Sequence, residues 1–147
     1  MIPTLRKMEL TDLDRVLSIE QRVHPHPWTR GNFIDALNSG YLCQVYEAQQ
    51  KLVGYAVLMA VVDEMHLLNI SIDSEFQRQG QGAKLLHKML EAARSLPMQR
   101  VLLEVRRSNL AAQGLYRKAG FSELAVRRNY YVAANGREDA LVMEYRL

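Results

Sequence analysis

The chain has 147 residues, a length that fits one domain with a substantial core. Its hydrophobic fraction of 48% and charged fraction of 24% exclude a disordered or fibrous chain. The formal charge of +3 is scattered, which argues against a nucleic-acid-binding stripe. No apolar run reaches the roughly 18 residues that span a bilayer, and the start lacks the apolar stretch of a signal peptide. We therefore expect a cytoplasmic protein, a monomer or weak oligomer, with no direct nucleic-acid or membrane partner.

The first part of the chain predicts a short strand and two helices. The strand covers residues 4–8. Thr11 is expected to cap a helix over residues 12–23, because apolar residues recur there at helical spacing. The segment HPHPW, residues 24–28, ends that helix. Thr29 is then expected to cap a second, shorter helix.

Three strands follow, because apolar and polar residues alternate in each of them. Their predicted ranges are 41–48, 52–62 and 66–73. Cys43 lies in the first of these strands, so we expect a buried structural thiol and not a nucleophile. As the only cysteine, it leaves no internal disulfide and fits a reducing compartment.

The C-terminal part predicts a strand, a helix and a strand pair. The expected ranges are a strand over 100–106, a helix over 109–119 that Gly120 stops, and strands over 121–128 and 140–145 with a turn at Asn135-Gly136. With a helix behind residue 80 that Pro97 ends, the order is βααβββαβαββ. That order indicates an α/β sheet with a helix pair near its start.

A glycine loop, EFQRQGQGAKLL, joins the third of these middle strands to the next helix at residues 75–86. A strand that leads through a glycine loop into a helix directs unpaired N–H groups at one spot, where the helix dipole favours negative charge. Gly80 and Gly82 permit close backbone approach, and Arg78 can add charge-assisted hydrogen bonds. The spacing matches neither a P-loop nor a dinucleotide fingerprint. We expect a pyrophosphate site, the alternative being a strand-to-helix turn without a ligand.

Two signatures resemble one protein family. QRQGQG, Gln77 to Gly82, resembles the Gln/Arg-x-x-Gly-x-Gly/Ala pyrophosphate loop of the Gcn5-related N-acetyltransferases, which bind acetyl-coenzyme A. NLAAQGLYRKAGF, residues 109–121, resembles their second signature, Asn-x-x-Ala-x-x-Leu-Tyr-x-x-x-Gly-Phe. IEQRVHPHPW, LEVRRSN and RRNYYVAANGREDALVM resemble a bacterial branch of this family, so the resemblance spans nearly the whole chain. It implies a single N-acetyltransferase domain over residues 1–147, with a mixed, mostly antiparallel seven-stranded sheet whose central parallel strands splay apart between flanking helices.

The resemblance also implies which positions hold acetyl-coenzyme A. Backbone groups of a strand would bind the pantetheine arm, the glycine loop would cradle the pyrophosphate, and an asparagine would contact the sulfur end. The matching residues are Ile70, Ser71, Ile72, Gln77, Arg78, Gln79, Gly80, Gln81, Gly82, Ala83 and Asn109. We expect no metal, because His24 and His26 have no further partners at ligand spacing.

By the same resemblance, Glu104 matches the family's proposed general base and Tyr116 its proposed general acid. An amine attacks a thioester only when neutral, and an α-amine has a pKa of roughly 7.7 to 8.0 against about 10.4 for lysine. A base is therefore needed, acting directly or through one water. Two plainer alternatives remain open: Glu104 could pair with Arg106 or Arg128 across the sheet, and Tyr116 could be an ordinary core residue.

We expect Glu64, Tyr130 and Tyr131 to line the substrate groove. The resemblance implies acetylation of a protein N-terminal α-amine, with the N-terminal alanine of small-subunit ribosomal protein S18 as the expected target. One alternative is an enzyme that acetylates a small amine, such as a polyamine or an aminoglycoside. Such sites need acidic clusters, and only Asp63-Glu64 resembles one. The other alternative is a non-catalytic acyl-coenzyme A sensor or regulatory binding module.

Overall fold

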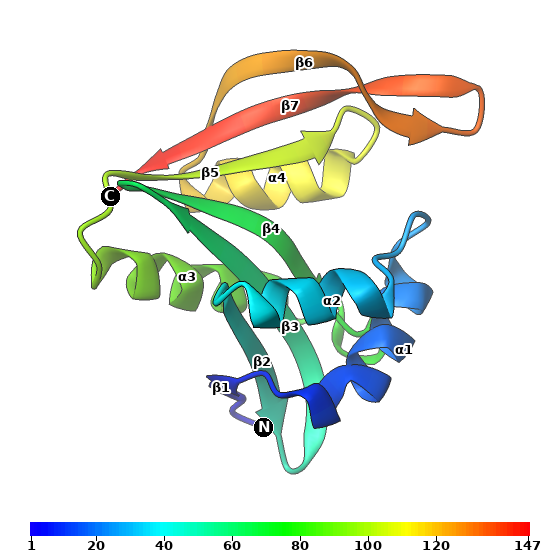
Figure 1. The fold of residues 1–147 in the computed structure, drawn as a ribbon, viewed down its shortest axis with the longest axis vertical. Helices are drawn as coiled ribbons and strands as arrows, with labels where there is room; N and C mark the ends of the chain where they lie inside the picture. Colours follow the sequence, from blue (N-terminus) through cyan, green and yellow to red (C-terminus); the bar gives the residue numbers. More distant parts are fainter.

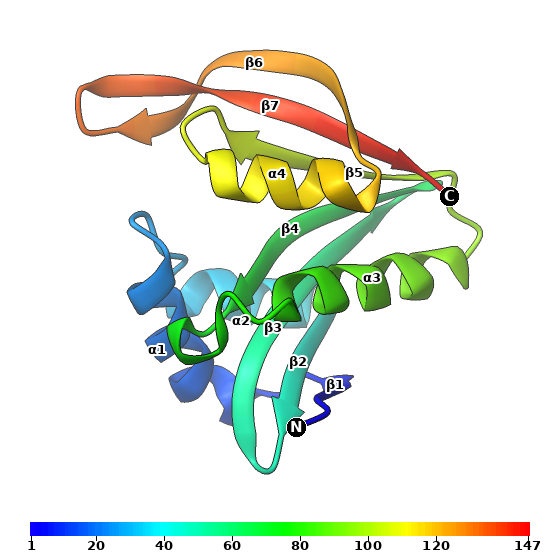
Figure 2. The ribbon, with the colours of Figure 1, turned by 180° about the vertical axis from the view of Figure 1, so that it is seen from behind.

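The computed structural model describes all 147 residues, and its strands form one seven-stranded sheet with two helices on each face (Figures 1 and 2). The strands are β1 (Thr4–Lys7), β2 (Leu42–Ala48), β3 (Lys51–Val61), β4 (Glu64–Ile72), β5 (Arg100–Arg106), β6 (Ser122–Ala133) and β7 (Gly136–Arg146). The helices are α1 (Leu13–Val23), α2 (Arg30–Asn38), α3 (Gln81–Arg94) and α4 (Leu110–Ala119). The sheet order is β1-β2-β3-β4-β5-β7-β6, and only β4 and β5 run parallel. The fold predicted from the resemblance is confirmed.

Each sheet face has its own core, because strand side chains alternate between the faces. On one face α3 and α4 cover the sheet, with Leu85 and Met89 packing near Val101 and Leu103. On the other face α1 and α2 pack in a second cluster that includes Phe33. Figure 2 shows α3 and α4 together on the near side, with α1 and α2 behind the strands.

The parallel strands β4 and β5 part halfway along their length. They pair from Glu64 with Arg100 to Leu67 with Leu103, and no pairing follows. Residues 69–72 of β4 stay paired with β3 on their other side, from Asn69 opposite Val57 to Ile72 opposite Gly54. The sheet therefore opens at its centre, where β4 presents backbone N–H and C=O groups that no strand satisfies.

The N-terminal capping prediction for Thr11 is wrong, although the cap predicted for the second helix is confirmed. A short 3₁₀ turn, Leu10–Asp12, precedes α1, and Thr11 lies inside it. The buried carboxylate of Asp12 instead accepts the N–H of Glu9 at 2.8 Å and pairs with Arg6 at 2.7 Å. Asp12 is itself the N-cap residue of α1, and no side chain caps this helix. At α2, Thr29 Oγ1 accepts the N–H of Asn32 at 3.2 Å, as the sequence predicts.

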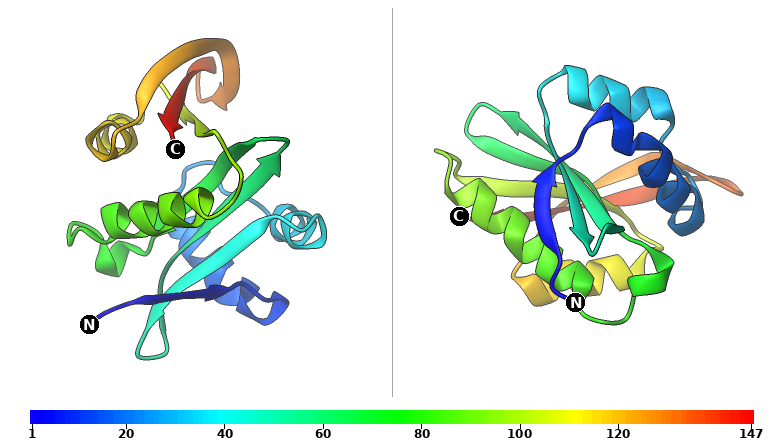
Figure 3. Two further views of the ribbon diagram at one scale, coloured as in Figure 1. Left: turned by 90° about the vertical axis from the view of Figure 1, so that its left-hand side faces the viewer. Right: turned by 90° about the horizontal axis from the view of Figure 1, so that it is seen from below.

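The C-terminal strands are longer than predicted because a bulge interrupts their alternation. Their pairing passes from Arg127 opposite Ala140 to Tyr131 opposite Glu138, so three residues of β6 face one of β7. Asn129 has φ +54° within this bulge. Figure 3 shows the β6–β7 hairpin at the end of the molecule opposite to β1. The bulge re-aims the side chains that follow it.

Two smaller expectations concern the core and the helices. Cys43 is buried, and burial raises the pKa of its thiol to about 11, which confirms a structural role for it. None of the helices combines the length and the apolar character that crossing a bilayer requires.

Candidate active site

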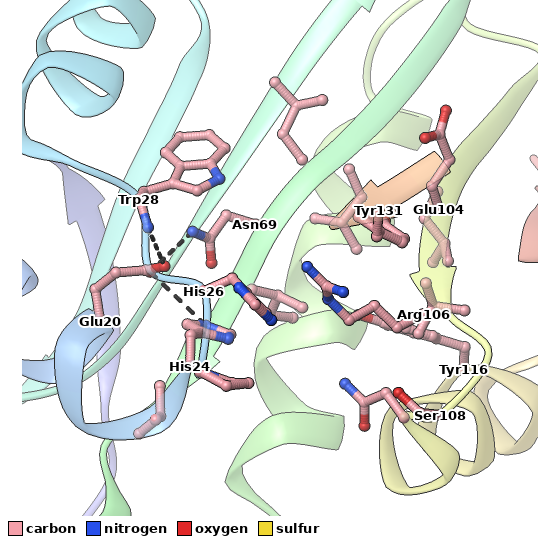
Figure 4. Close-up of a pocket in the computed structure, with 18 residues that line it drawn as sticks. Glu20, His24, His26, Trp28, Asn69, Glu104, Arg106, Ser108, Tyr116 and Tyr131 are labelled. Atoms are coloured by element: carbon pink, nitrogen blue, oxygen red, sulfur yellow. Dashed lines mark hydrogen bonds and ion pairs between the residues drawn. The ribbon is translucent and has the colours of Figure 1, made fainter. Parts of the chain in front are cut away.

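A groove of about 450 Å³ occupies the place where β4 and β5 part. Figure 4 shows Glu20, His24 and Trp28 on one side of it, and Arg106, Tyr116 and Tyr131 on the other. The first wall comes from α1 and the α1–α2 segment, residues 24–29, and the second from β5, β6 and α4.

The glycine loop brings backbone donors to one end of the open strand edge. Gly80, with φ +75°, begins α3, and no side chain caps the free N–H groups of its first turn. A Cβ on Gly82 would meet only the side chains of Leu115 and Ile72, at 3.7 and 3.8 Å, so no backbone crowds this position. Gln77 Nε2 donates to the carbonyl of Ile72 at 3.0 Å and ties the loop to β4. Donors held in this way suit an anionic group such as a pyrophosphate.

The remaining loop residues differ in what their side chains can offer. Arg78 and Gln79 are exposed, and Gln79 donates to the carbonyl of Glu75 at 3.5 Å. Gln81 is buried and accepts a hydrogen bond from the hydroxyl of Tyr46 at 3.3 Å. Ala83 is exposed on the first turn of the same helix. Arg78 and the loop backbone are therefore the groups best placed for a ligand.

Ile70 and Asn109 border the groove from two sides, and Ser71 follows Ile70 in β4. Ile70 belongs to the open stretch of β4 and lines the groove. Ser71 Oγ donates to Asn69 Oδ1 at 2.8 Å and also contacts His24 Nε2 at 2.7 Å. Asn109 caps α4, because its Oδ1 accepts the N–H of Ala112 at 3.1 Å. The structure thus brings the predicted pantetheine strand and the predicted sulfur-end residue to one groove.

Glu104 projects from the face of β5 opposite to Leu103 and Val105, as the alternation predicts. Its carboxylate lies 3.4 Å from Arg127 Nε, so the partner is neither Arg106 nor Arg128. A hydrogen bond to Glu104, followed by burial, raises the pKa of the Tyr130 hydroxyl. Glu104 also borders a second cavity of about 250 Å³ that opens next to the groove.

Tyr116 is both a core residue and a residue of the groove. Its side chain is 9% exposed and packs against Phe121, with ring centroids 5.8 Å apart. Burial raises the pKa of its hydroxyl to about 12, so the hydroxyl stays protonated at neutral pH. The core packing that the sequence left as an alternative is therefore present, and it does not remove Tyr116 from the groove.

The tyrosine pair of β6 lines the cavity beside Glu104. Tyr130 and Tyr131 pack edge to face with centroids 4.9 Å apart. The guanidinium of Arg106 stacks on Tyr131 at 4.4 Å and donates to Glu138 at 2.8 Å, which fixes Tyr131 against β5. Burial raises the pKa of Tyr131 to about 12.

Glu64 lies elsewhere, at the paired end of β4 and β5, where it forms an ion pair with Arg100. Its role in substrate binding stays a prediction.

The sequence reasoning missed a buried polar network around Glu20. This carboxylate is 1% exposed and accepts hydrogen bonds from Tyr55 Oη at 2.7 Å, Asn69 Nδ2 at 2.9 Å and the Trp28 N–H at 2.9 Å. Together these bonds fix the α1–α2 segment to β3 and β4, as Figure 4 shows in part. A signal existed, because Glu20 continues the apolar stripe of α1, where an acidic side chain must find partners. His24 and His26 line the groove, and the chain holds no cluster of three metal-ligating side chains.

Comparisons with known proteins agree with this geometry. A family model described as the acetyltransferase (GNAT) family matches residues 11–121. The chain is 39% identical over 140 residues to the ribosomal protein bS18-alanine N-acetyltransferase of Escherichia coli (strain K12), covering 95% of each. The crystal structure of the ribosomal-protein-S18-alanine N-acetyltransferase from Escherichia coli matches with a TM-score of 0.91 and 38% identity, covering 99% of this chain and 94% of that chain. Ard1 from Thermoplasma volcanium matches with a TM-score of 0.88 and 27% identity, covering 100% and 99%.

Proposed function

The chain belongs to the GNAT family of acetyltransferases, and from that premise we propose that it transfers an acetyl group from acetyl-coenzyme A to the N-terminal α-amine of a protein. The 39% identity to a ribosomal protein bS18-alanine N-acetyltransferase, over 95% of both chains, supports the N-terminal alanine of ribosomal protein S18 as the acceptor. Family membership confirms the resemblance that the two sequence signatures indicate.

The groove fits acetyl-coenzyme A, which supplies an activated acetyl thioester when bound. The free N–H groups at the start of α3, with Arg78 beside them, suit its pyrophosphate. The open edge of β4 at Ile70 and Ile72 offers main-chain donors and acceptors to its amide-containing arm. Asn109 is the polar residue that we assign to its sulfur end. Most of these contacts come from the backbone, so they depend on the path of the chain more than on side chains.

Glu104 is the residue that we assign to deprotonate the acceptor. Its carboxylate borders both the groove and the adjoining cavity, so an ammonium group in that cavity would reach it. The proton passes from the ammonium nitrogen to a carboxylate oxygen, directly or through one water, and leaves a neutral amine. Tyr116 lies in α4, on the other sheet face, and its protonated hydroxyl can donate to the departing thiolate.

The observation that carries the proposal is the meeting of the two cavities at Glu104, Leu68 and Tyr131. An acceptor can enter from the side of β6 and the α1–α2 segment while acetyl-coenzyme A occupies the strand opening. The charges in these cavities argue against a polyamine acceptor. Arg106 and Arg127 line them, and the carboxylate of Glu20 already accepts three hydrogen bonds. A polycation would meet repulsion there.

Intact-mass spectrometry tests the proposed function. Ribosomal proteins from an acetylation-deficient source are incubated with the purified protein and acetyl-coenzyme A. We expect one protein, S18, to gain a single acetyl group at its N-terminus. Acetyl transfer to polyamines or aminoglycosides alone would support the small-amine alternative. Binding of acetyl-coenzyme A without transfer to any acceptor would support the sensor alternative.

A further inference from the structure

Arg127 is the one cation in contact with Glu104, and this contact is loose. The Nε to Oε1 distance is 3.4 Å, and the side chains are 58% and 25% exposed. Exposed ion pairs of this kind contribute little to stability. By contrast, Arg106 is 19% exposed and donates to both Glu138 and the carbonyl of Val132 at 2.8 Å. Arg106 is thus fixed, whereas Arg127 is free to leave its carboxylate.

Arg127 contacts Tyr130 at the same time as Glu104. Its guanidinium lies 5.3 Å from the ring centroid of Tyr130, whose face can hold a cation without the help of Glu104. The bulge that follows Arg127 in β6 makes this arrangement possible, because it turns Tyr130 toward the cavity that Arg127 and Tyr131 also border. Strict alternation would have sent Tyr130 to the opposite face from Arg127.

The cavity leaves an acceptor ammonium only one carboxylate to approach. The titratable or charged side chains that border it with Glu104 are Arg127, Tyr130 and Tyr131 of β6 and His66 of β4, while β7 contributes Val142 and the α1–α2 segment contributes Trp28. Since two cations repel one another, an ammonium and the guanidinium of Arg127 compete for Glu104.

We infer that Arg127 is a positioning residue that acts as a displaceable counter-ion of Glu104, and that the α-ammonium of the acceptor takes its place. This inference rests on the proposed function. Before the acceptor binds, the contact with Arg127 keeps the carboxylate directed at the cavity. When the acceptor arrives, the guanidinium of Arg127 gives up its contact with Glu104 and keeps the one with Tyr130, so the carboxylate can take the ammonium proton without a competing cation. Only the N–H bond of the ammonium breaks, and only an O–H bond on Glu104 forms.

The experiment compares Arg127→Met with Arg128→Met. Arg128 is the next residue of β6, is also exposed, and forms no ion pair, so the second variant makes the same charge change without touching Glu104. Steady-state kinetics are measured at low salt with acetyl-coenzyme A and a short peptide that begins with alanine. Because the ion pair between Arg127 and Glu104 is exposed and therefore weak, its loss can change the peptide KM by about fivefold at most. We expect the peptide KM to fall by up to about that factor in Arg127→Met and to stay unchanged in Arg128→Met, with KM for acetyl-coenzyme A constant in both.

Arg127→Lys supplies the second variant, and it should keep a peptide KM close to that of the unaltered protein, because a lysine is also a displaceable cation. If both Met variants had the same peptide KM as the unaltered protein, the inference would be overturned. A raised KM in Arg127→Met alone would also overturn it, since the arginine would then bind the peptide. Failure of the unaltered protein to acetylate the peptide would count against the proposed function instead.

Discussion

The two sides of the opening between β4 and β5 differ in whether backbone groups or side chains form them. The cofactor side consists mainly of backbone, namely the free N–H groups behind Gly80 and the open edge of β4. The acceptor side consists of side chains from distant segments, with Glu20 and Trp28 facing Tyr131 across the groove. A site made of backbone depends on where the chain turns, whereas a site made of side chains depends on which segments meet. The predictions below separate the two sides.

The largest effect is expected on the acceptor side, at Glu104. Glu104→Gln keeps the shape of the side chain but cannot accept the ammonium proton. We expect kcat/KM for the peptide to fall by about 10²- to 10⁴-fold, the usual contribution of general acid–base catalysis. Isothermal titration should show that acetyl-coenzyme A binds as before, because the carboxylate does not belong to the backbone-built side. Glu123→Gln, an exposed change in β6, serves as the control and should leave kcat/KM unaltered.

Tyr116→Phe should have the next largest effect, because it removes the hydroxyl and keeps the ring against Phe121. A loss of kcat at the lower end of the general-acid range, about 10²-fold, is expected, with little change in thermal stability. Since burial raises the pKa of this hydroxyl to about 12, it stays protonated at lower pH. The kcat profile of the unaltered enzyme should therefore show no fall due to Tyr116 until the pH approaches that value. Full activity of Tyr116→Phe would leave the residue with its core role only.

Glu20→Gln tests whether the buried network shapes the acceptor side. A carboxamide cannot accept all three hydrogen bonds from Tyr55, Asn69 and Trp28, so one buried donor loses its partner. Such a loss costs about 1–3 kcal/mol of stability, which denaturant unfolding would measure. We also expect a raised KM for the peptide and an unchanged KM for acetyl-coenzyme A. Equal effects on both KM values would mean that the network supports the fold as a whole and not the α1–α2 segment.

The smallest effect is expected from a pair of glycines that share one backbone conformation. Gly40 and Gly80 both have φ +75°, and a Cβ at either would meet nothing within 4 Å. Alanine at either position should cost about 1 kcal/mol of stability, because the left-handed region disfavours a side chain. Only Gly80→Ala should raise KM for acetyl-coenzyme A, since Gly40 lies behind α2, away from the loop. A matching rise in Gly40→Ala would show that the glycine loop has no special part in binding.

The same division explains what the sequence could predict. The glycine loop and the helix α4 lie in contiguous signatures, and the order of strands follows from alternation. The structure has the loop before α3, and α4 ends at Gly120, as the sequence predicts. The partner of Glu104 could not be found in this way, because β7 lies between β5 and β6, and only this sheet order brings Arg127 near Glu104. Periodicity cannot register an extra residue in a strand, so the prediction ended the strand at Arg128.

Glu20 and Glu64 also show that the sequence does not reveal the partners of an acidic residue. Glu20 was visible as an acidic residue in an apolar stripe, yet its three donors come from β3, β4 and the α1–α2 segment, which only the tertiary fold brings together. Glu64 is a residue that the sequence analysis places in the substrate groove. In the fold Arg100 bridges it to Glu144, at 2.7 Å from the latter. Charge patterns in a sequence do not state which charges neutralise one another.

The central claim is that the acceptor is an N-terminal α-amine, and one measurement tests it most directly. A peptide that begins with alanine and contains an internal lysine is incubated with the protein and acetyl-coenzyme A, and fragmentation mass spectrometry locates the added acetyl group. We predict a single acetyl on the α-amine, whose pKa of roughly 7.7 to 8.0 lies well below the value of about 10.4 for lysine. An acetyl group on the lysine side chain would contradict the account. Transfer that occurs only when the N-terminus of the same peptide is blocked would also contradict it.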